Sequence, residues 1–174
     1  MKKFLTISLI FFGIIFLAGC EKQSVKTTPV VNNSPKQDES ETAKNALINF
    51  FDYLNRNEFE KALTVFNLDD PNNSWEGLES FSLPEERSNK AKVLENYCKA
   101  VGTCLEANVL EIKEVTSGEY NLVVQFLKSD GNIFIQGPCC GETEETMPSI
   151  NRFDFRVKKI NNTFKVLTPP VYMP

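Results

Sequence analysis

No histidine occurs among the 174 residues of this chain. Imidazole is the side chain best suited to act as a general base near neutral pH, and it is also the commonest metal ligand. Its absence excludes hydrolases of the Ser-His-Asp and Cys-His types, in which histidine accepts the proton of the nucleophile. We therefore expect no catalytic residues of these kinds, no metal site and no cofactor.

An excess of basic residues is lacking as well. The chain has 19 Lys and Arg residues against 23 Asp and Glu residues, which gives a formal net charge of −4. Nucleic acids and anionic membranes repel a protein of this charge, because both are themselves negatively charged. We expect no nucleic-acid partner, and attachment to a membrane requires something other than basic side chains.

The N-terminus contains the most informative pattern in the chain. Two lysines, Lys2 and Lys3, precede the mostly apolar run Phe4–Leu17. This layout is typical of an export signal. The run is shorter than the roughly 20 residues that a membrane-spanning helix needs, and it is followed directly by Ala18, Gly19 and Cys20.

The tetrapeptide Leu17-Ala18-Gly19-Cys20 resembles the lipobox of a bacterial lipoprotein signal peptide. The resemblance implies cleavage before Cys20 and acylation of its thiol. The mature protein is then lipid-anchored on the extracytoplasmic face of a cell membrane. Two or more acyl chains hold a protein stably, because each buried methylene contributes about 0.8 kcal/mol. An uncut signal anchor that crosses the bilayer is the alternative.

Three segments are predicted from this division. Residues 1–19 are the signal peptide, residues 20–41 are the lipidated cysteine with a flexible tether, and residues 42–174 are one folded domain. The tether contains no aromatic residue and few large apolar residues, so it cannot bury enough surface to offset the entropy lost on ordering. The remaining length is typical of a single domain.

Helical spacing of apolar residues dominates the first half of the domain. We predict a first helix with Thr42 as its N-cap, and a second, shorter helix after the polar corner Asn55-Arg56-Asn57. A loop carrying Trp75 follows. A third helix is predicted near Ser82, whose spacing to Glu85 suits a capping box, and it ends at Gly102. The predicted buried residues of the three helices are Ala43, Ala46, Leu47, Phe50, Phe51, Leu54, Phe59, Ala62, Leu63, Phe66, Ala91, Leu94, Tyr97, Cys98 and Val101.

The second half alternates between apolar and polar residues, as strands do. We predict a strand from Leu105 with a bulge near Val109-Leu110, a strand around 120–126, a short strand at 132–136, and a strand around 153–158. Asn161-Asn162 suits a two-residue hairpin turn before a last strand. Helices followed by an antiparallel meander indicate the α+β class, with N-terminal helices packed on a curved sheet.

The corner Asn55–Ala62 between two helices, a third helix and a meander that ends in a hairpin resemble the nuclear transport factor 2-like superfamily, which has a cystatin-like cone fold. The resemblance covers about Thr42 to Val171. It implies a cone-shaped pocket, used for catalysis in some members and for ligand or partner binding in others. Residues proposed to line such a pocket are Phe50, Tyr53, Trp75 and Tyr120.

Isomerase-type members of this superfamily use a tyrosine and acidic residues inside the pocket. The nearest matches here are Tyr53 and Asp154. Asp154 alternates with Phe153 and Phe155, however, so we expect it to face solvent. No catalytic set can be matched residue by residue.

Four cysteines remain besides Cys20, an even number in a compartment where disulfides persist. Cys98 and Cys104 flank a short connection and are predicted to pair. Cys139 and Cys140 then remain as a vicinal disulfide, which requires a strained loop. A thiol-redox centre and a metal site are the alternatives, but neither the Cys-x-x-Cys spacing nor a histidine is present.

These observations favour a non-catalytic binding or interaction module of the bacterial cell envelope, whose partner is an envelope protein or a small apolar ligand. Two alternatives stay open. One is a histidine-free enzyme of isomerase or cyclase type in the same cone, recognisable by a buried carboxyl group with a raised pKa. The other is a purely structural lipoprotein whose cone is filled by phenylalanine.

Overall fold

The computed structural model describes residues 35–70 and 75–170. The predicted signal peptide, Cys20 and most of the predicted tether lie outside these residues. Among the described helices, none is both long and apolar enough to cross a bilayer.

Helix α1 (Pro35–Asn55) begins well before the predicted N-cap. Proline is well tolerated in the first turn of a helix, and the residues between Pro35 and Thr42 include no glycine or second proline to interrupt it. Thr42 therefore lies inside the helix, and the prediction that it caps the helix is wrong. The apolar stripe is confirmed, since Leu47, Phe50 and Phe51 are completely buried.

The polar corner after α1 leads into helix α2 (Phe59–Val65), as the apolar spacing predicted. Asn57 adopts a left-handed backbone conformation with φ of 60°, which asparagine tolerates better than most residues. The amide of Glu58 donates a hydrogen bond of 2.8 Å to the carbonyl oxygen of Tyr53. This turn directs α2 back against α1, and the two helices pack together.

Two features of the next segment differ from the prediction. The expected loop contains a short helix, α3 (Trp75–Glu79), whose Trp75 and Leu78 are buried. The capping box at Ser82 is wrong, because only the 3₁₀ turn Pro84–Glu86 follows it. Helix α4 (Lys90–Ala100) begins later, where the Asn89 side chain accepts a hydrogen bond of 3.1 Å from the amide of Lys92.

The end of α4 agrees with the prediction. Gly102 follows the helix with φ of 89°, a conformation that glycine adopts without the steric cost of a Cβ atom.

Four strands form one antiparallel sheet in the order β1-β2-β3-β4. The strands are β1 (Glu106–Thr116), β2 (Glu119–Leu127), β3 (Phe153–Ile160) and β4 (Thr163–Val166). The predicted bulge is confirmed between Val109 and Glu111, where the register shifts. Asn161 and Asn162 form the predicted hairpin turn with φ values of 49° and 64°, typical of a type I′ turn.

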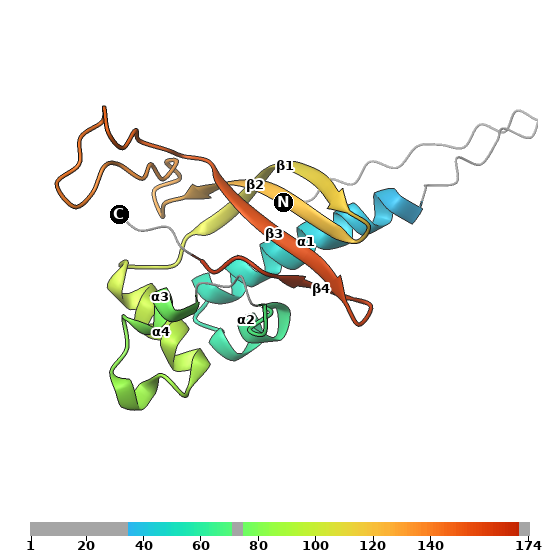
Figure 1. Cartoon of the computed structure of the whole chain (residues 1–174), viewed down its shortest axis with the longest axis horizontal. Coiled ribbons are helices and arrows are strands. Elements are labelled where there is room, and N and C mark those ends of the chain that lie inside the picture. Colours follow the sequence, from blue (N-terminus) through green and yellow to red (C-terminus); the bar gives the residue numbers. More distant parts are fainter. Residues whose placement is uncertain (1–34, 71–74, 171–174) are drawn as a thin grey trace, which may run out of the picture. The chain divides into compact units, whose positions relative to one another are not determined.

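A strand at 132–136 is not formed. This segment makes only isolated bridges, from Ile133 to Leu127 and from Gln136 to Ile150, and the amide of Phe134 donates a hydrogen bond of 2.8 Å to the carbonyl oxygen of Phe126. A longer ladder cannot form, because β3 already pairs with β2 up to Val124. The connection between β2 and β3 projects beyond the end of the sheet (Figure 1).

Helix α1 lies across one face of the sheet (Figure 1) and contacts all four strands. The shorter helices gather beside it, with α4 packed against α2 and α3. Phe51 is at the centre of this interface, with its ring edge-on to Phe126 and Phe155 at centroid distances of 4.9 and 5.1 Å. The fold is therefore α+β, with helices on a curved antiparallel sheet.

Candidate functional site

The four residues proposed to line a central pocket are part of the core or of its border. Phe50 is fully buried and stacks on Phe66 at 5.3 Å, while Trp75 packs against the same ring at 5.7 Å. Tyr120 is 1% exposed and meets Phe164 at 5.8 Å. Phe50, Trp75 and Tyr120 therefore each pack against another aromatic ring.

Tyr53 is half-buried on α1 and packs against the hydrophobic core. The ammonium group of Lys61 lies 5.9 Å from the centre of its ring, a cation–π contact between the first two helices. Asp154 is exposed, as predicted, and accepts a hydrogen bond of 2.8 Å from the side chain of Asn121. The structure does not bring Tyr53 and Asp154 together in one site.

Glu119 is the buried carboxylate of the described residues, with 7% exposure. Arg156 donates two hydrogen bonds to its Oε1 atom, at 3.1 and 2.5 Å, and the Lys158 ammonium lies 3.3 Å from Oε2. The bonds from Arg156 lower the pKa of Glu119 and outweigh the opposing effect of burial. Glu119 therefore stays ionised near neutral pH and is unsuited to act as a general acid.

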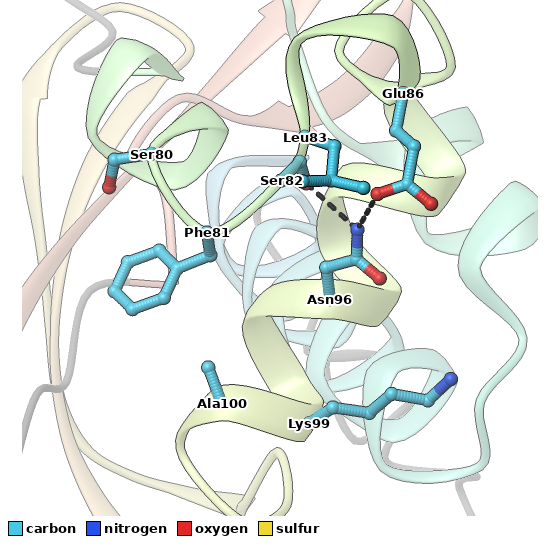
Figure 2. A pocket seen from close by; sticks show the side chains of 8 residues that line it. All are labelled: Ser80, Phe81, Ser82, Leu83, Glu86, Asn96, Lys99 and Ala100. Atoms are coloured by element: carbon cyan, nitrogen blue, oxygen red, sulfur yellow. Dashed lines mark hydrogen bonds between the residues drawn. The ribbon is translucent and has the colours of Figure 1, made fainter.

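A surface hollow of about 520 Å³ lies between the segment after α3 and the last turns of α4. Figure 2 shows Asn96 directed between Ser82 and Glu86. Its Nδ2 atom donates to Ser82 Oγ at 3.0 Å and to Glu86 Oε2 at 2.8 Å. Asn96 thereby ties residues 82–86 to α4 and shapes one wall of the hollow.

Apolar, polar and charged side chains line this hollow together. Phe81 packs edge-on against Tyr97 at 5.3 Å, Leu83 is 59% exposed, and Lys99 adds a cation. The Ser82 hydroxyl is buried and accepts a hydrogen bond from the Asn96 amide. The hollow is open and shallow, as a contact surface for another macromolecule is.

A second, smaller hollow of about 290 Å³ lies where β1 begins and β2 ends. Its lining includes Asn55, Leu105 and Lys128. None of the four predicted pocket residues lines either hollow. Each hollow combines the end of a helix or strand with a neighbouring irregular segment, so no periodic pattern predicts it.

Cys98 and Cys104 form the predicted disulfide, with Cα atoms 5.0 Å apart. The bond joins α4 to the start of β1. Cys139 and Cys140 are free thiols rather than the predicted vicinal disulfide. Their sulfur atoms nevertheless lie 2.8 Å apart.

Comparison with known proteins gives little similarity. No protein-family model matches the chain, and no curated protein matches its sequence. A crystal structure from Campylobacter jejuni, described as an NTF2-like transpeptidase, aligns over 71% of this chain and 95% of that chain, at 14% identity and a TM-score of 0.41. These values are too low to assign a family or an activity.

Proposed function

We propose that the chain is a lipid-anchored protein of the bacterial cell envelope, whose α+β domain is a non-catalytic interaction module outside the cytoplasm. The observation that carries this proposal is the tetrapeptide Leu17-Ala18-Gly19-Cys20 after a short apolar run. In this proposal, acyl chains on Cys20 attach the protein to the membrane. The order of helices and strands supports membership of the nuclear transport factor 2-like superfamily, but a fold of that kind serves many functions.

The packing of the domain supports surface binding over an internal ligand site. Phe51 contacts both Phe50 and Phe126, and all three rings are fully buried, so this part of the interior is filled by side chains. The open hollow beside Asn96 offers exposed apolar and charged groups instead. An envelope protein is therefore favoured as the partner.

The buried carboxylate weakens the alternative of a histidine-free enzyme. A general acid or base in a pocket is recognised by a pKa raised toward neutrality, whereas the ion pair with Arg156 moves the pKa of Glu119 downward. A purely structural role is favoured by the same aromatic packing of the interior. This structural role is the second candidate. Detection of a specific partner would distinguish the interaction module from it.

The anchor is tested by growing the producing bacterium with labelled palmitate. The wild-type chain should incorporate label and fractionate with membranes, and Cys20→Ala should lose both properties. Cys140→Ala is the matched control, because it removes a different thiol and should remain labelled. An unlabelled wild-type chain that still begins with methionine would contradict the proposal.

The interaction role is tested by cross-linking and capture from native membranes. Leu83 and Val115 are equally exposed, at 59%, but only Leu83 lines the hollow. We expect Leu83→Asp to lose a captured partner that Val115→Asp retains. If both variants lose the partner, or if both retain it, the hollow is not the binding surface.

A further inference from the structure

The thiols of Cys139 and Cys140 are arranged for bond formation. Their sulfur atoms are 2.8 Å apart, and a disulfide bond is about 2.05 Å long. Closing the bond therefore requires an approach of about 0.8 Å, for which the strained backbone of the loop must adjust together with the side chains. Cys98 and Cys104, the two other described cysteines, already form a disulfide with each other.

Cys139 and Cys140 are accessible to solvent, and hydrogen bonding within their loop holds the backbone around them. Cys140 is exposed and Cys139 is half-buried, in the connection that projects beyond the sheet (Figure 1). The amide of Glu142 donates a hydrogen bond of 2.9 Å to the carbonyl oxygen of Cys139. Cys140 has φ of 60°, a left-handed conformation that is uncommon for a residue with a Cβ atom. Such backbone strain concentrates at functional sites.

A metal site does not account for this arrangement. Tetrahedral zinc requires four ligands, at least three of them from the protein. No group of three metal-ligating side chains is found in the part of the chain that the structure describes. The pair is thus better suited to react with sulfur than to hold a metal ion.

We propose that Cys139 and Cys140 are a reversible dithiol–disulfide couple that exchanges with an external disulfide. The activity goes beyond the proposed envelope role and does not depend on it, because the reacting atoms lie within one loop. Cys140 is the attacking residue, since it is the more exposed thiol. Cys139 is the resolving residue.

Electrostatics of the loop agree with these roles. The hydrogen bond with Cys140 raises the pKa of the Cys139 thiol, and the negative charge of Glu142 acts in the same direction. Cys139 therefore keeps its proton while Cys140 makes the first attack. Only the thiolate is nucleophilic, so a raised pKa slows the initial attack by Cys139.

The exchange proceeds in two steps. The Cys140 thiolate attacks one sulfur of the external disulfide, so that a mixed disulfide forms and the first external thiolate leaves. Cys139 then loses its proton to solvent and attacks the Cys140 sulfur, which forms the Cys139–Cys140 bond and releases the second external thiolate. Two electrons pass from the protein dithiol to the external disulfide, which is reduced to two thiols.

The test uses oxidised glutathione as the external disulfide and the full chain purified in detergent. After acid quenching and alkylation, trypsin releases residues 129–152 as a peptide that contains no cysteine besides Cys139 and Cys140. We expect the wild-type peptide to become lighter by two hydrogen atoms and to lose both alkylatable thiols. Reduced glutathione in excess should restore the two thiols.

Two single variants separate the roles. Cys139→Ser should retain one glutathione on Cys140, because the resolving thiol is absent. Cys140→Ser should acquire glutathione several-fold more slowly. The disulfide between the peptides that contain Cys98 and Cys104 reports in each sample that the fold is intact. The proposal is overturned if the wild-type peptide keeps both thiols, takes up two glutathiones, or forms only intermolecular disulfides.

Discussion

The side chain of Asn55 donates a hydrogen bond of 2.7 Å to the carbonyl oxygen of Cys104. The bond joins the last residue of α1 to the residue of the disulfide that precedes β1. Two crosslinks, one covalent and one polar, therefore meet at Cys104. This junction connects the long helix, α4 and the first strand.

Replacing Asn55 with alanine should destabilise the domain by about 0.5–1.5 kcal/mol, because the partly buried carbonyl group of Cys104 loses its closer donor and keeps only the Thr103 hydroxyl at 3.4 Å. The measurement is the free energy of unfolding from denaturant titration. Asn45→Ala is the matched control, since Asn45 is exposed on the same helix. It should be neutral or slightly stabilising. Equal effects of the two substitutions would contradict the role of the hydrogen bond.

The disulfide at this junction should stabilise the domain by about 2 kcal/mol, a value typical of a bond that closes a short loop. A reductant should lower the unfolding midpoint of the wild-type chain. The double variant Cys98→Ser, Cys104→Ser should already have the lower midpoint and should not respond to the reductant. If the reductant also lowered the unfolding midpoint of the double variant, the loss of stability would come from other cysteines.

The aromatic centre of the core should be the most sensitive position tested. Phe51→Ala removes a fully buried ring that contacts Phe126 and Phe155, at an expected cost of about 3–5 kcal/mol. Val115→Ala changes a residue that is 59% exposed and should alter stability by less than about 0.5 kcal/mol. Both values are obtained from thermal and denaturant unfolding. A small effect at Phe51 would show that the centre of the core repacks readily.

The ion pair of Glu119 predicts how stability depends on pH. The hydrogen bonds from Arg156 place the pKa of Glu119 in the folded protein below its ordinary value of 4.5. Their stabilising effect is therefore complete above pH 4.5 and is lost as the pH falls through the folded-state pKa. Wild type should exceed Glu119→Gln in stability at neutral pH, and the difference should shrink in acid.

The control for this comparison is Glu111→Gln. Glu111 forms an ion pair of 2.8 Å with Arg152, but both side chains are more than half exposed, so the pair should contribute little. Unfolding of both variants and wild type at several pH values provides the measurement. A difference between wild type and Glu119→Gln that is constant with pH would contradict the assignment.

The wall of the hollow should open when Asn96 is replaced by aspartate. The new carboxylate is of the same size but cannot donate to Ser82, and it repels Glu86, which now lies 2.8 Å from the Asn96 donor. Hydrogen exchange of residues 80–89 should become faster, while exchange in the sheet stays unchanged. Asn108→Asp, at an exposed position of β1, is the control. Unaltered exchange at 80–89 would mean that other contacts hold this wall.

Several elements were predictable from the sequence because their signal is local. The apolar stripe from Ala43 to Leu54 repeats with the helical period, and Tyr120 to Phe126 alternate as a half-buried strand. The turn at Asn161-Asn162 needs two residues that tolerate positive φ. In each case the periodicity or the backbone preference depends on neighbouring residues alone.

Only the tertiary structure decided where the helices begin, which residues face a cavity, and how the cysteines lie. Thr42 and Ser82 are good caps in isolation, yet α1 starts at Pro35 and α4 starts after Asn89. The choice between competing caps depends on packing against distant elements. The apolar spacing of Phe50 and Tyr120 does not say which residues they meet. Contacts between segments distant in the sequence stack Phe50 on Phe66 and place Tyr120 against Phe164.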